Sequence, residues 1–353
     1  MENNQSPQQE TTPNQFRKFC TDIFVNEILE ELKPFEEERK KVKKKYLQNI
    51  AINFILILFT TIFIIYLCSR IPPDDVKMGI CPAMGIICGI SLIAFPFIYI
   101  ITSRIITEPK YFEHGIKIEV MPKIFDKIPN FEWTNTNDGI IPLIIIKVFR
   151  LIGHFNAKDN DESFWGNYKN TKISIDECIL KRDENDDWYV APFKGVLILL
   201  ETDHKLTNEP VIIKADGLRN GLNKLYKKID NIFCFKKSLN LYPDLQKINL
   251  EDVKFEKKYD VYCEDQIEAR YLLTTAFMER LNNIKFAFNA DSIEVSVISN
   301  KMLIAVHTHR DLFKVTNIHK PIYSFNQYKT MVEEFASILE MIDTLKINRN
   351  IGL

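Results

Sequence analysis

The run YLQNIAINFILILFTTIFIIYLC, residues 46–68, decides the fold class of this chain of 353 residues. The run holds no charged residue and only scattered Gln, Asn and Thr. Because an α-helix rises about 1.5 Å per residue, a helix of this length crosses the roughly 30 Å hydrocarbon core of a bilayer. A soluble helix of equal length usually carries a polar stripe, and the position and length of the run exclude a cleaved signal peptide. We therefore expect a transmembrane helix over residues 46–68.

A second uncharged run, ICPAMGIICGISLIAFPFIYII, covers residues 80–101, and a short external turn at residues 69–79 separates the two. The pair predicts a two-helix transmembrane hairpin. Gly85 and Gly89 have the spacing that lets two helix backbones approach closely, so they are candidate helix-packing positions. Their partner is either the first span or a second copy of the chain. Neither run contains Asp, Glu, Lys, Arg or His, which argues against a channel or transporter.

Basic residues flank both membrane runs on the same side. Six of them lie between Arg39 and Lys45, and Arg104 and Lys110 follow the second run. An excess of Lys and Arg is typical of cytoplasmic flanks, so we expect both termini in the cytoplasm. An alternative role of the basic run is to bind anionic lipid headgroups.

The chain before the membrane divides into a polar tail, residues 1–15, and a cytoplasmic helical segment, residues 16–45. The tail has too little apolar surface to fold and is expected to be disordered. In the helical segment apolar residues recur at helical spacing up to Pro34, which is expected to begin a second helix. The apolar face of the first helix needs a partner. That partner is the downstream domain or another chain, and docking within the chain is the preferred interpretation.

Residues 111–353 are expected to form a cytoplasmic α+β domain with an antiparallel sheet and packed helices. Strands are predicted at residues 171–180, 193–202, 210–216, 254–263, 292–299 and 301–309. Residues 139–153, GIIPLIIIKVFRLIG, fit a buried strand or a helix that begins at Pro142, and a helix is the preferred interpretation. The Asn-rich residues 154–170 predict a loop, and residues 324–346 predict a closing amphipathic helix.

Composition excludes several function classes. The formal net charge of −1 gives no basis for nucleic-acid binding. Seven cysteines without a CxxC pair fit a reduced compartment and no zinc site. The sequence has no nucleotide-binding or hydrolase motif, so no cofactor is predicted. His307 and His309 have a spacing that metals use, with Asp311 beyond, but the end of a surface strand explains them equally well and no metal site is predicted.

The run DQIEARYLLTTAFMERL places an acid, a base and a tyrosine at the start of an apolar helix. Asp265 and Glu268 have the spacing of a capping box, in which each side chain accepts from a backbone N–H of the first turn. Arg270 shares a helix face with apolar residues, so it must snorkel, stack on a ring or pair with a carboxylate. Glu251 and Asp252 are its candidate partners.

The longer run KFEKKYDVYCEDQIEARYLLTTAFMERL, residues 254–281, resembles the signature of a bacterial membrane family catalogued as domain of unknown function 3137. Members of that family place a two-helix membrane hairpin ahead of a cytoplasmic domain. The resemblance is close at Asp265, Gln266, Glu268, Ala269, Arg270 and Tyr271. It departs at Thr275, where proline is expected. The resemblance implies a bacterial inner-membrane protein and supplies no activity, so these positions have no assigned role.

Two functions of different class follow from these observations. The favoured function is a membrane-anchored cytoplasmic interaction or scaffold module, whose partners are the lipid bilayer and either another protein or a second copy. The alternative is an unrecognised enzyme that acts on a membrane-proximal substrate. It requires Glu268, Arg270, His307 and His309 to converge in a pocket. No catalytic residue is assigned.

Overall fold

A computed structural model divides the chain into two compact units. The first unit contains Met1–Val25, Met121–Phe313 and Tyr328–Leu353, and the second contains Asn26–Val120 and Lys314–Gln327. The structure describes residues 12–69, 81–182, 191–215, 242, 244–250, 252–310, 312–313 and 317–351.

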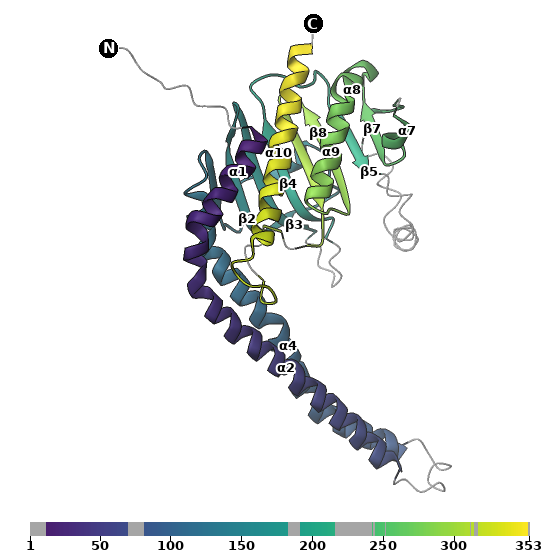
Figure 1. Ribbon diagram of the computed structural model, residues 1–353. Helices are drawn as coiled ribbons and strands as arrows, with labels where there is room; N and C mark the ends of the chain where they lie inside the picture. The colour runs from purple at the N-terminus through teal and green to yellow at the C-terminus, as the bar shows by residue number, and fades with distance from the viewer. Residues whose placement is uncertain are drawn as a thin grey trace. The chain divides into compact units, whose positions relative to one another are not determined.

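The described part of the first unit is built on one nine-stranded sheet in which all neighbouring strands are antiparallel (Figure 1). The strand order is β1-β2-β3-β4-β9-β8-β5-β7-β6. The strands are β1 Phe131–Thr134, β2 Ala157–Tyr168, β3 Thr171–Lys181, β4 Phe193–Glu201, β5 Val211–Ala215, β6 Gln246–Ile248, β7 Tyr259–Cys263, β8 Ser292–Ile298 and β9 Lys301–His307. The predicted α+β class with an antiparallel sheet is confirmed.

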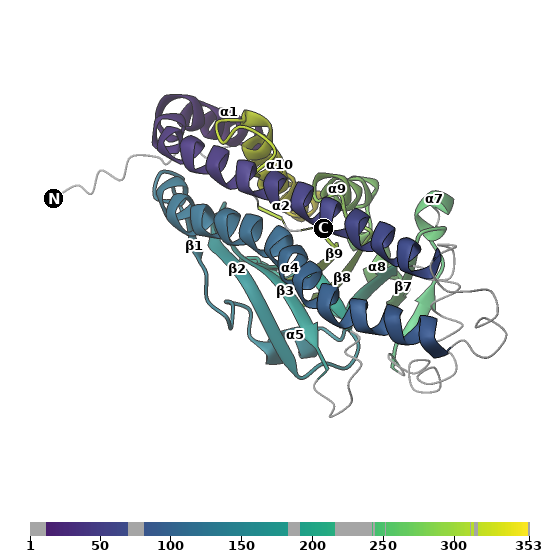
Figure 2. The ribbon, with the colours of Figure 1, turned by 90° about the horizontal axis from the view of Figure 1, so that it is seen from below.

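Helices cover both faces of this sheet (Figure 2). The helical elements are α1 Pro13–Ile23, the π-helix η1 Phe24–Ile28, α2 Leu29–Ser69, α4 Cys81–Phe125, α5 Leu143–Val148, α7 Val253–Glu256, α8 Gln266–Leu272, α9 Thr275–Ala287 and α10 Phe325–Ile351. Helices α1, α9 and α10 lie on one face, and the short α5 lies on the other. The preferred interpretation of residues 139–153 as a helix is confirmed by α5.

An aromatic cluster joins the sheet to the helices on the α10 face. The Phe164 ring of β2 lies 5.1 Å from Phe125 at the end of α4, 4.6 Å from Phe313 and 5.1 Å from Phe335 of α10, measured between ring centroids. Helix α1 joins the same layer, because Arg17 pairs with Glu333 of α10 at 2.8 Å. The apolar residues Phe16, Cys20 and Ile23 of α1 are buried, and the Phe16 ring lies 6.3 Å from the Phe131 ring of β1, so the apolar face of the first helix docks within the chain.

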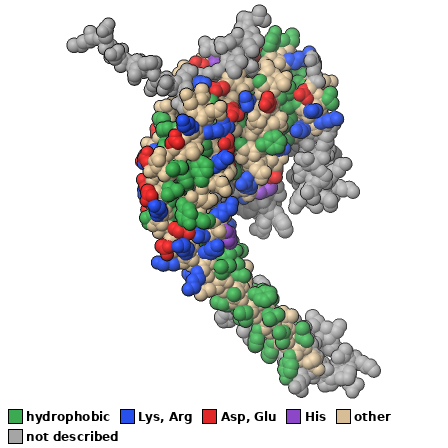
Figure 3. All heavy atoms as spheres, viewed as in Figure 1, with side chains coloured by type: hydrophobic (Ala, Val, Ile, Leu, Met, Phe, Trp, Pro, Cys, Tyr) green, Lys and Arg blue, Asp and Glu red, His purple; other side chains and the backbone are tan. Residues whose placement is uncertain are grey.

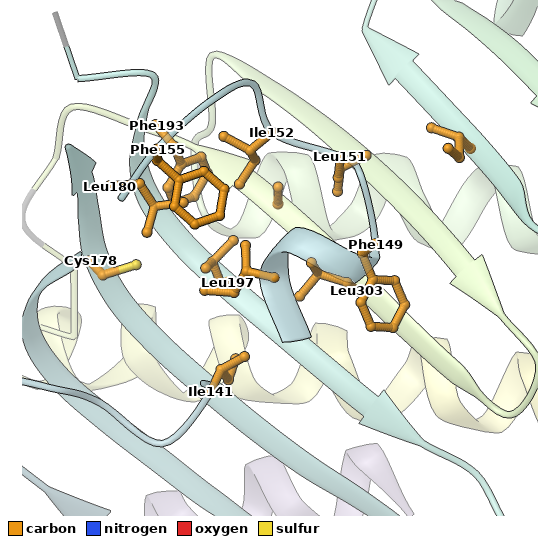
Figure 4. Packing of buried hydrophobic residues seen from close by; sticks show 13 residues of the cluster. Ile141, Phe149, Leu151, Ile152, Phe155, Cys178, Leu180, Phe193, Leu197 and Leu303 are labelled. Carbon is orange, nitrogen blue, oxygen red and sulfur yellow. The ribbon is translucent and has the colours of Figure 1, made fainter. Parts of the chain in front are cut away.

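The opposite face of the sheet carries a second core under α5 (Figure 4). Strand residues alternate between the two faces, and Cys178, Leu197 and Leu303 point from three neighbouring strands toward α5. Ile146 of α5 and Phe155, which follows it, close this core. Both faces of the sheet are thus apolar.

Strand β2 overturns the prediction of a loop over residues 154–170. Its polar residues Asn160, Glu162 and Ser163 are buried, at 6%, 1% and 0% exposure. Sequence periodicity failed here because it assumes that inward-facing side chains are apolar. In β2 several inward-facing side chains are polar and bond to one another instead.

Two further elements differ from the sequence prediction. Residues 254–263, predicted as one strand, form α7 followed by β7, because Asp252 caps a short helix by accepting from the N–H groups of Lys254 and Phe255. The helix predicted after Asp265 breaks into α8 and α9, since Thr274 begins α9 by accepting from the N–H of Phe277.

The N-terminal helices also differ from the prediction. Helix α1 begins at Pro13, inside the predicted tail, because Thr12 and Gln15 form a capping box; residues 1–11 lie outside the described residues. Pro34 does not begin a new helix. It lies inside α2, where it removes only one backbone hydrogen bond.

Among the described residues, one helical run, Pro13–Tyr66, is long and apolar enough to cross a membrane. Helices α2 and α4 lie side by side (Figures 1 and 2). Asn53 donates to the hydroxyl of Thr102 at 2.9 Å, and Lys45 pairs with Glu108 at 2.8 Å. The earlier residue of α2, Lys45, contacts the later residue of α4, Glu108. The two helices are therefore antiparallel.

A substitution at Gly195 tests the packing of the sheet. At this residue β4 passes too close to β9 for a side chain. A Cβ at Gly195 would lie 2.0 Å from the carbonyl oxygen of Val306, and its φ of +147° disfavours L residues. We expect Gly195→Ala to lower the free energy of unfolding by roughly 2–4 kcal/mol, measured by denaturant unfolding in detergent. Gly153→Ala is the matched control, since its Cβ meets no atom within 4 Å. Equal stability of the two variants would contradict the described packing.

Candidate functional site

A carboxylate-lined cavity lies at an irregularity in β2. The register between β2 and β3 shifts between Asn160 and Glu162, which leaves Asp161 as an extra residue in the strand. Bulges of this kind re-aim side chains and are frequent beside active sites. The cavity has a volume of about 280 Å³.

Three carboxylates meet at the bulge. Glu162 lies directly opposite Glu177 across the β2–β3 pair, and oxygens of Asp161, Glu162 and Glu177 lie within 4.8 Å of one another. The indole N–H of Trp133 donates to Glu162 at 2.9 Å, and the backbone N–H of Leu312 donates to Glu177 at 2.9 Å. Asp161 is exposed, whereas the two glutamates are buried.

The cavity combines charges of both signs. Asp161 and Glu177 line it together with Lys194 and Arg310. Carboxylates at this separation can bind a hard cation such as Ca²⁺ or Mg²⁺. Lys194 and Arg310 can also balance the negative charge of the carboxylates when no metal ion is bound. Cys178 also lines the cavity, but burial raises the pKa of its thiol, so it is a poor nucleophile.

Beside the bulge, a buried network around Asp176 holds a loop onto the sheet. The Asp176 carboxylate accepts from Lys158 at 2.9 Å, from the Ser163 hydroxyl at 2.6 Å, and from the N–H groups of Ile140 and Ile141 at 3.0 and 2.9 Å. Lys158 and Asp176 have side chains only 3% and 0% exposed. Removing one partner of such a pair costs more than the pair itself contributes, because a buried charge is left uncompensated. The network therefore anchors the segment that leads into α5.

A second charged cluster lies on the α5 face, between β5, β8 and β9. Glu294 accepts from Lys214 at 2.6 Å, and its carboxylate lies 3.4 Å from Nε2 of His307. Burial raises the pKa of Glu294, but the charges of Lys214 and His307 outweigh it, and the net pKa is lowered. Lys214 also donates to the carbonyl of Leu151 at 2.7 Å, which ties the segment after α5 to the sheet.

The motif positions of α8 lie at the start of the helix and on its surface. Asp265 caps α8 by accepting from the N–H of Ile267 at 2.8 Å, as predicted. Glu268 does not complete the capping box; its carboxylate accepts from the backbone and side-chain N–H groups of Asn208. Arg270 is exposed.

The other motif residues are structural or exposed. Ala269 is fully buried, Gln266 is exposed, and Tyr271 is 65% exposed. Thr275, where the family resemblance leads to proline, is the first residue of α9, a position that proline tolerates.

In the described part of the chain, His307 and His309 have different surroundings. His307 belongs to the Glu294 cluster, whereas the His309 side chain is 87% exposed and lies 4.0 Å from Asp291. Asp311 lies outside the described residues. Neither histidine, nor Glu268 or Arg270, lines the cavity at the bulge.

One prediction remains untested, and one site was not predicted from the sequence. Gly85 and Gly89 lie in α4, but their packing lies outside the described residues. The bulge cavity was missed because its strand was read as a loop. The alternation of Asn160, Glu162 and Phe164 was a signal for a strand, but two of these three residues are polar.

The Glu294 cluster predicts a pH dependence of stability. Because the pKa of Glu294 is lowered, its contribution is complete above the ordinary carboxyl value of 4.5 and is lost as the pH falls through the lowered value. We expect the free energy of unfolding to fall more steeply below pH 4.5 in the wild type than in Glu294→Gln. Denaturant unfolding at a series of pH values measures both slopes. Parallel curves would show that the ion cluster contributes nothing.

Comparison with known proteins gives one match, to a family model. Residues 191–347 match the family model described as protein of unknown function (DUF3137). No curated protein and no solved structure matches the chain. The matched range includes α8 and its six motif positions but not the glutamates of the bulge. From β4 to the last turns of α10, the chain therefore resembles the family of unknown function that the sequence motif predicted.

Proposed function

We propose that this protein is a membrane-anchored interaction module of the bacterial inner membrane. Helices α2 and α4 form a two-span hairpin with both termini in the cytoplasm, and the α+β unit recruits a protein partner. The observation that carries the proposal is the apolar surface of α2. Phe54, Phe59 and Ile65 are 67%, 66% and 63% exposed. Contact of these side chains with water is unfavourable, whereas contact with the hydrocarbon of a bilayer is not.

The pairing of the helices supports a second span. Because α2 and α4 are antiparallel and joined by the Asn53–Thr102 hydrogen bond, a bilayer around α2 also surrounds the neighbouring turns of α4. The sequence of α4 is uncharged from Cys81 to Ile101, which is long enough for the hydrocarbon core. A polar pair such as Asn53–Thr102 is a common link between membrane helices.

The surface of α8 supports recruitment rather than catalysis. Ile267 and Tyr271 lie one turn apart and are 61% and 65% exposed, with the exposed Arg270 beside Tyr271. Aromatic and arginine side chains dominate the energetics of protein interfaces. The acid of the same helix, Glu268, is bound to Asn208 instead of facing a cavity.

The bulge cavity supports the alternative function, an enzyme, because charged side chains line it. Asp161, Glu177, Lys194 and Arg310 are the groups with which such an enzyme would work, and they replace the residues that the sequence suggested for this role. Acid–base or cation-assisted chemistry is what this set can perform.

Reporter fusions test the proposed topology. We expect alkaline phosphatase to be active when it is fused at Asp75 in the turn and inactive when it is fused at either terminus. Green fluorescent protein should give the reverse pattern, because the basic flanks retain both termini in the cytoplasm. Active phosphatase at the C-terminus would mean a single span and would contradict the hairpin.

Substitutions on α8 test the interaction surface. We expect Ile267→Ser with Tyr271→Ala to reduce recovery of a specific crosslinked partner by at least about tenfold, because exposed aromatic anchors carry much of an interface's affinity. The melting temperature should remain unchanged. Phe286→Ser on α9 is the matched control, since Phe286 is 75% exposed and outside the motif. Recovery of the same partners by both variants would argue against the module.

A further inference from the structure

The segment of residues 317–323, here called the strap, is fastened to the helices of the second unit. A guanidinium N–H of Arg39 on α2 donates to the carbonyl of Ile318 at 2.6 Å. The N–H of Ile318 donates to Glu113 of α4 at 3.2 Å, and the N–H of Ile322 donates to Glu36 of α2 at 3.0 Å. Both helices therefore hold the strap through its backbone.

The fastening is buried. Glu36 and Arg39 are 8% and 6% exposed, and two N–H groups of Arg39 donate to the Glu36 carboxylate at 2.6 and 2.9 Å. The hydrogen bond from Arg39 lowers the pKa of Glu36, which keeps the carboxylate charged. Arg39 was counted with the basic residues that flank the membrane, but its charge is neutralised inside the protein. It is not exposed to bind lipid.

The strap lies close to the predicted edge of the membrane. The His319 ring lies 5.4 Å from the ring of Tyr46, the first residue of the predicted span. From Tyr46 to Asn53 the helix advances about 10 Å, and polar contacts between α2 and α4 continue over that length. Because Tyr46 is the first residue of the predicted span, the neighbouring His319 lies at the level of the lipid headgroups that border the hydrocarbon core.

The strap presents positive charge at this level. His319 and Lys320 are exposed, and Lys43 lies between Arg39 and Tyr46 on the side of α2 that holds the strap. Lys43 and Lys320 form no ion pair with any residue that the structure describes. Figure 3 shows Lys, Arg and His side chains gathered where the apolar stretch of the helices begins.

We propose that the strap is a docking surface for anionic phospholipid headgroups, in which Lys43, His319 and Lys320 contact lipid phosphates. This inference rests on the proposed membrane anchoring. Charge complementarity selects the partner, because unpaired cations held within a Debye length of an anionic leaflet are drawn to it. The Tyr46 ring, in edge contact with the His319 ring, is an aromatic group of the kind enriched at membrane interfaces.

Hydrogen exchange of the full chain in lipid nanodiscs tests the strap. In discs with about 30 mol% phosphatidylglycerol we expect the strap peptide to exchange at least about threefold more slowly than in phosphatidylcholine discs. Lys43→Gln with Lys320→Gln should exchange at the same rate in both lipids. The matched control, Lys18→Gln with Lys329→Gln, removes two exposed lysines elsewhere and should keep the difference.

Each result has a distinct meaning. Equal exchange of the wild-type strap in the two lipids, or an unchanged difference in the Lys43/Lys320 variant, overturns the headgroup surface while leaving the anchor intact. Slower exchange in phosphatidylcholine discs after addition of glycerol 3-phosphate overturns the bilayer as the partner and assigns the site to free phosphates. Failure of the protein to enter nanodiscs of either composition overturns the proposed anchoring itself.

Discussion

A wide antiparallel sheet with two apolar faces must be covered on both sides, and this constraint organises the first unit. Helix α5 and the residues on either side of it cover part of one face with a short segment from the middle of the chain. The other face takes helices from both ends of the sequence, α1 and α10, which are joined by Arg17 and Glu333. The N-terminal helix thus belongs to the folded unit, although α2 and α4 intervene in the sequence.

Apolar periodicity predicted the elements whose inward side chains are apolar. Strands β3, β4, β5, β8 and β9 were predicted close to their observed bounds, as was α10. Strand β2 was missed because Asn160, Glu162 and Ser163 are polar and yet buried, so the strand shows no apolar period. Short β1 and β6 have too few residues to show a period. Such elements are defined by pairing, which a single sequence does not display.

For the candidate sites too, the sequence predicted contacts between neighbours in the chain and did not predict contacts made by strand pairing or by distant residues. Local spacing identified Asp265 as a helix cap, since cap and helix are adjacent in the chain. It misassigned Glu268, because Asn208, the partner of this carboxylate, lies 60 residues away. The bulge carboxylates and the Lys214–Glu294–His307 cluster were invisible for the same physical reason. Both depend on strand pairing: Glu162 faces Glu177 across the β2–β3 hairpin, and Lys214 meets Glu294 from 80 residues away.

The contact between Arg39 and Ile318 also has a consequence for biosynthesis. The two residues are 279 positions apart, and translation at about 5–20 residues per second separates their appearance by tens of seconds. During that interval Arg39 already has its carboxylate partner, because Glu36 lies three residues earlier on the same helix. The contact to Ile318 forms only when the last part of the chain emerges. The Glu36–Arg39 pair is therefore in place on α2 before the strap is synthesised, and the strap closes over a pair that already exists.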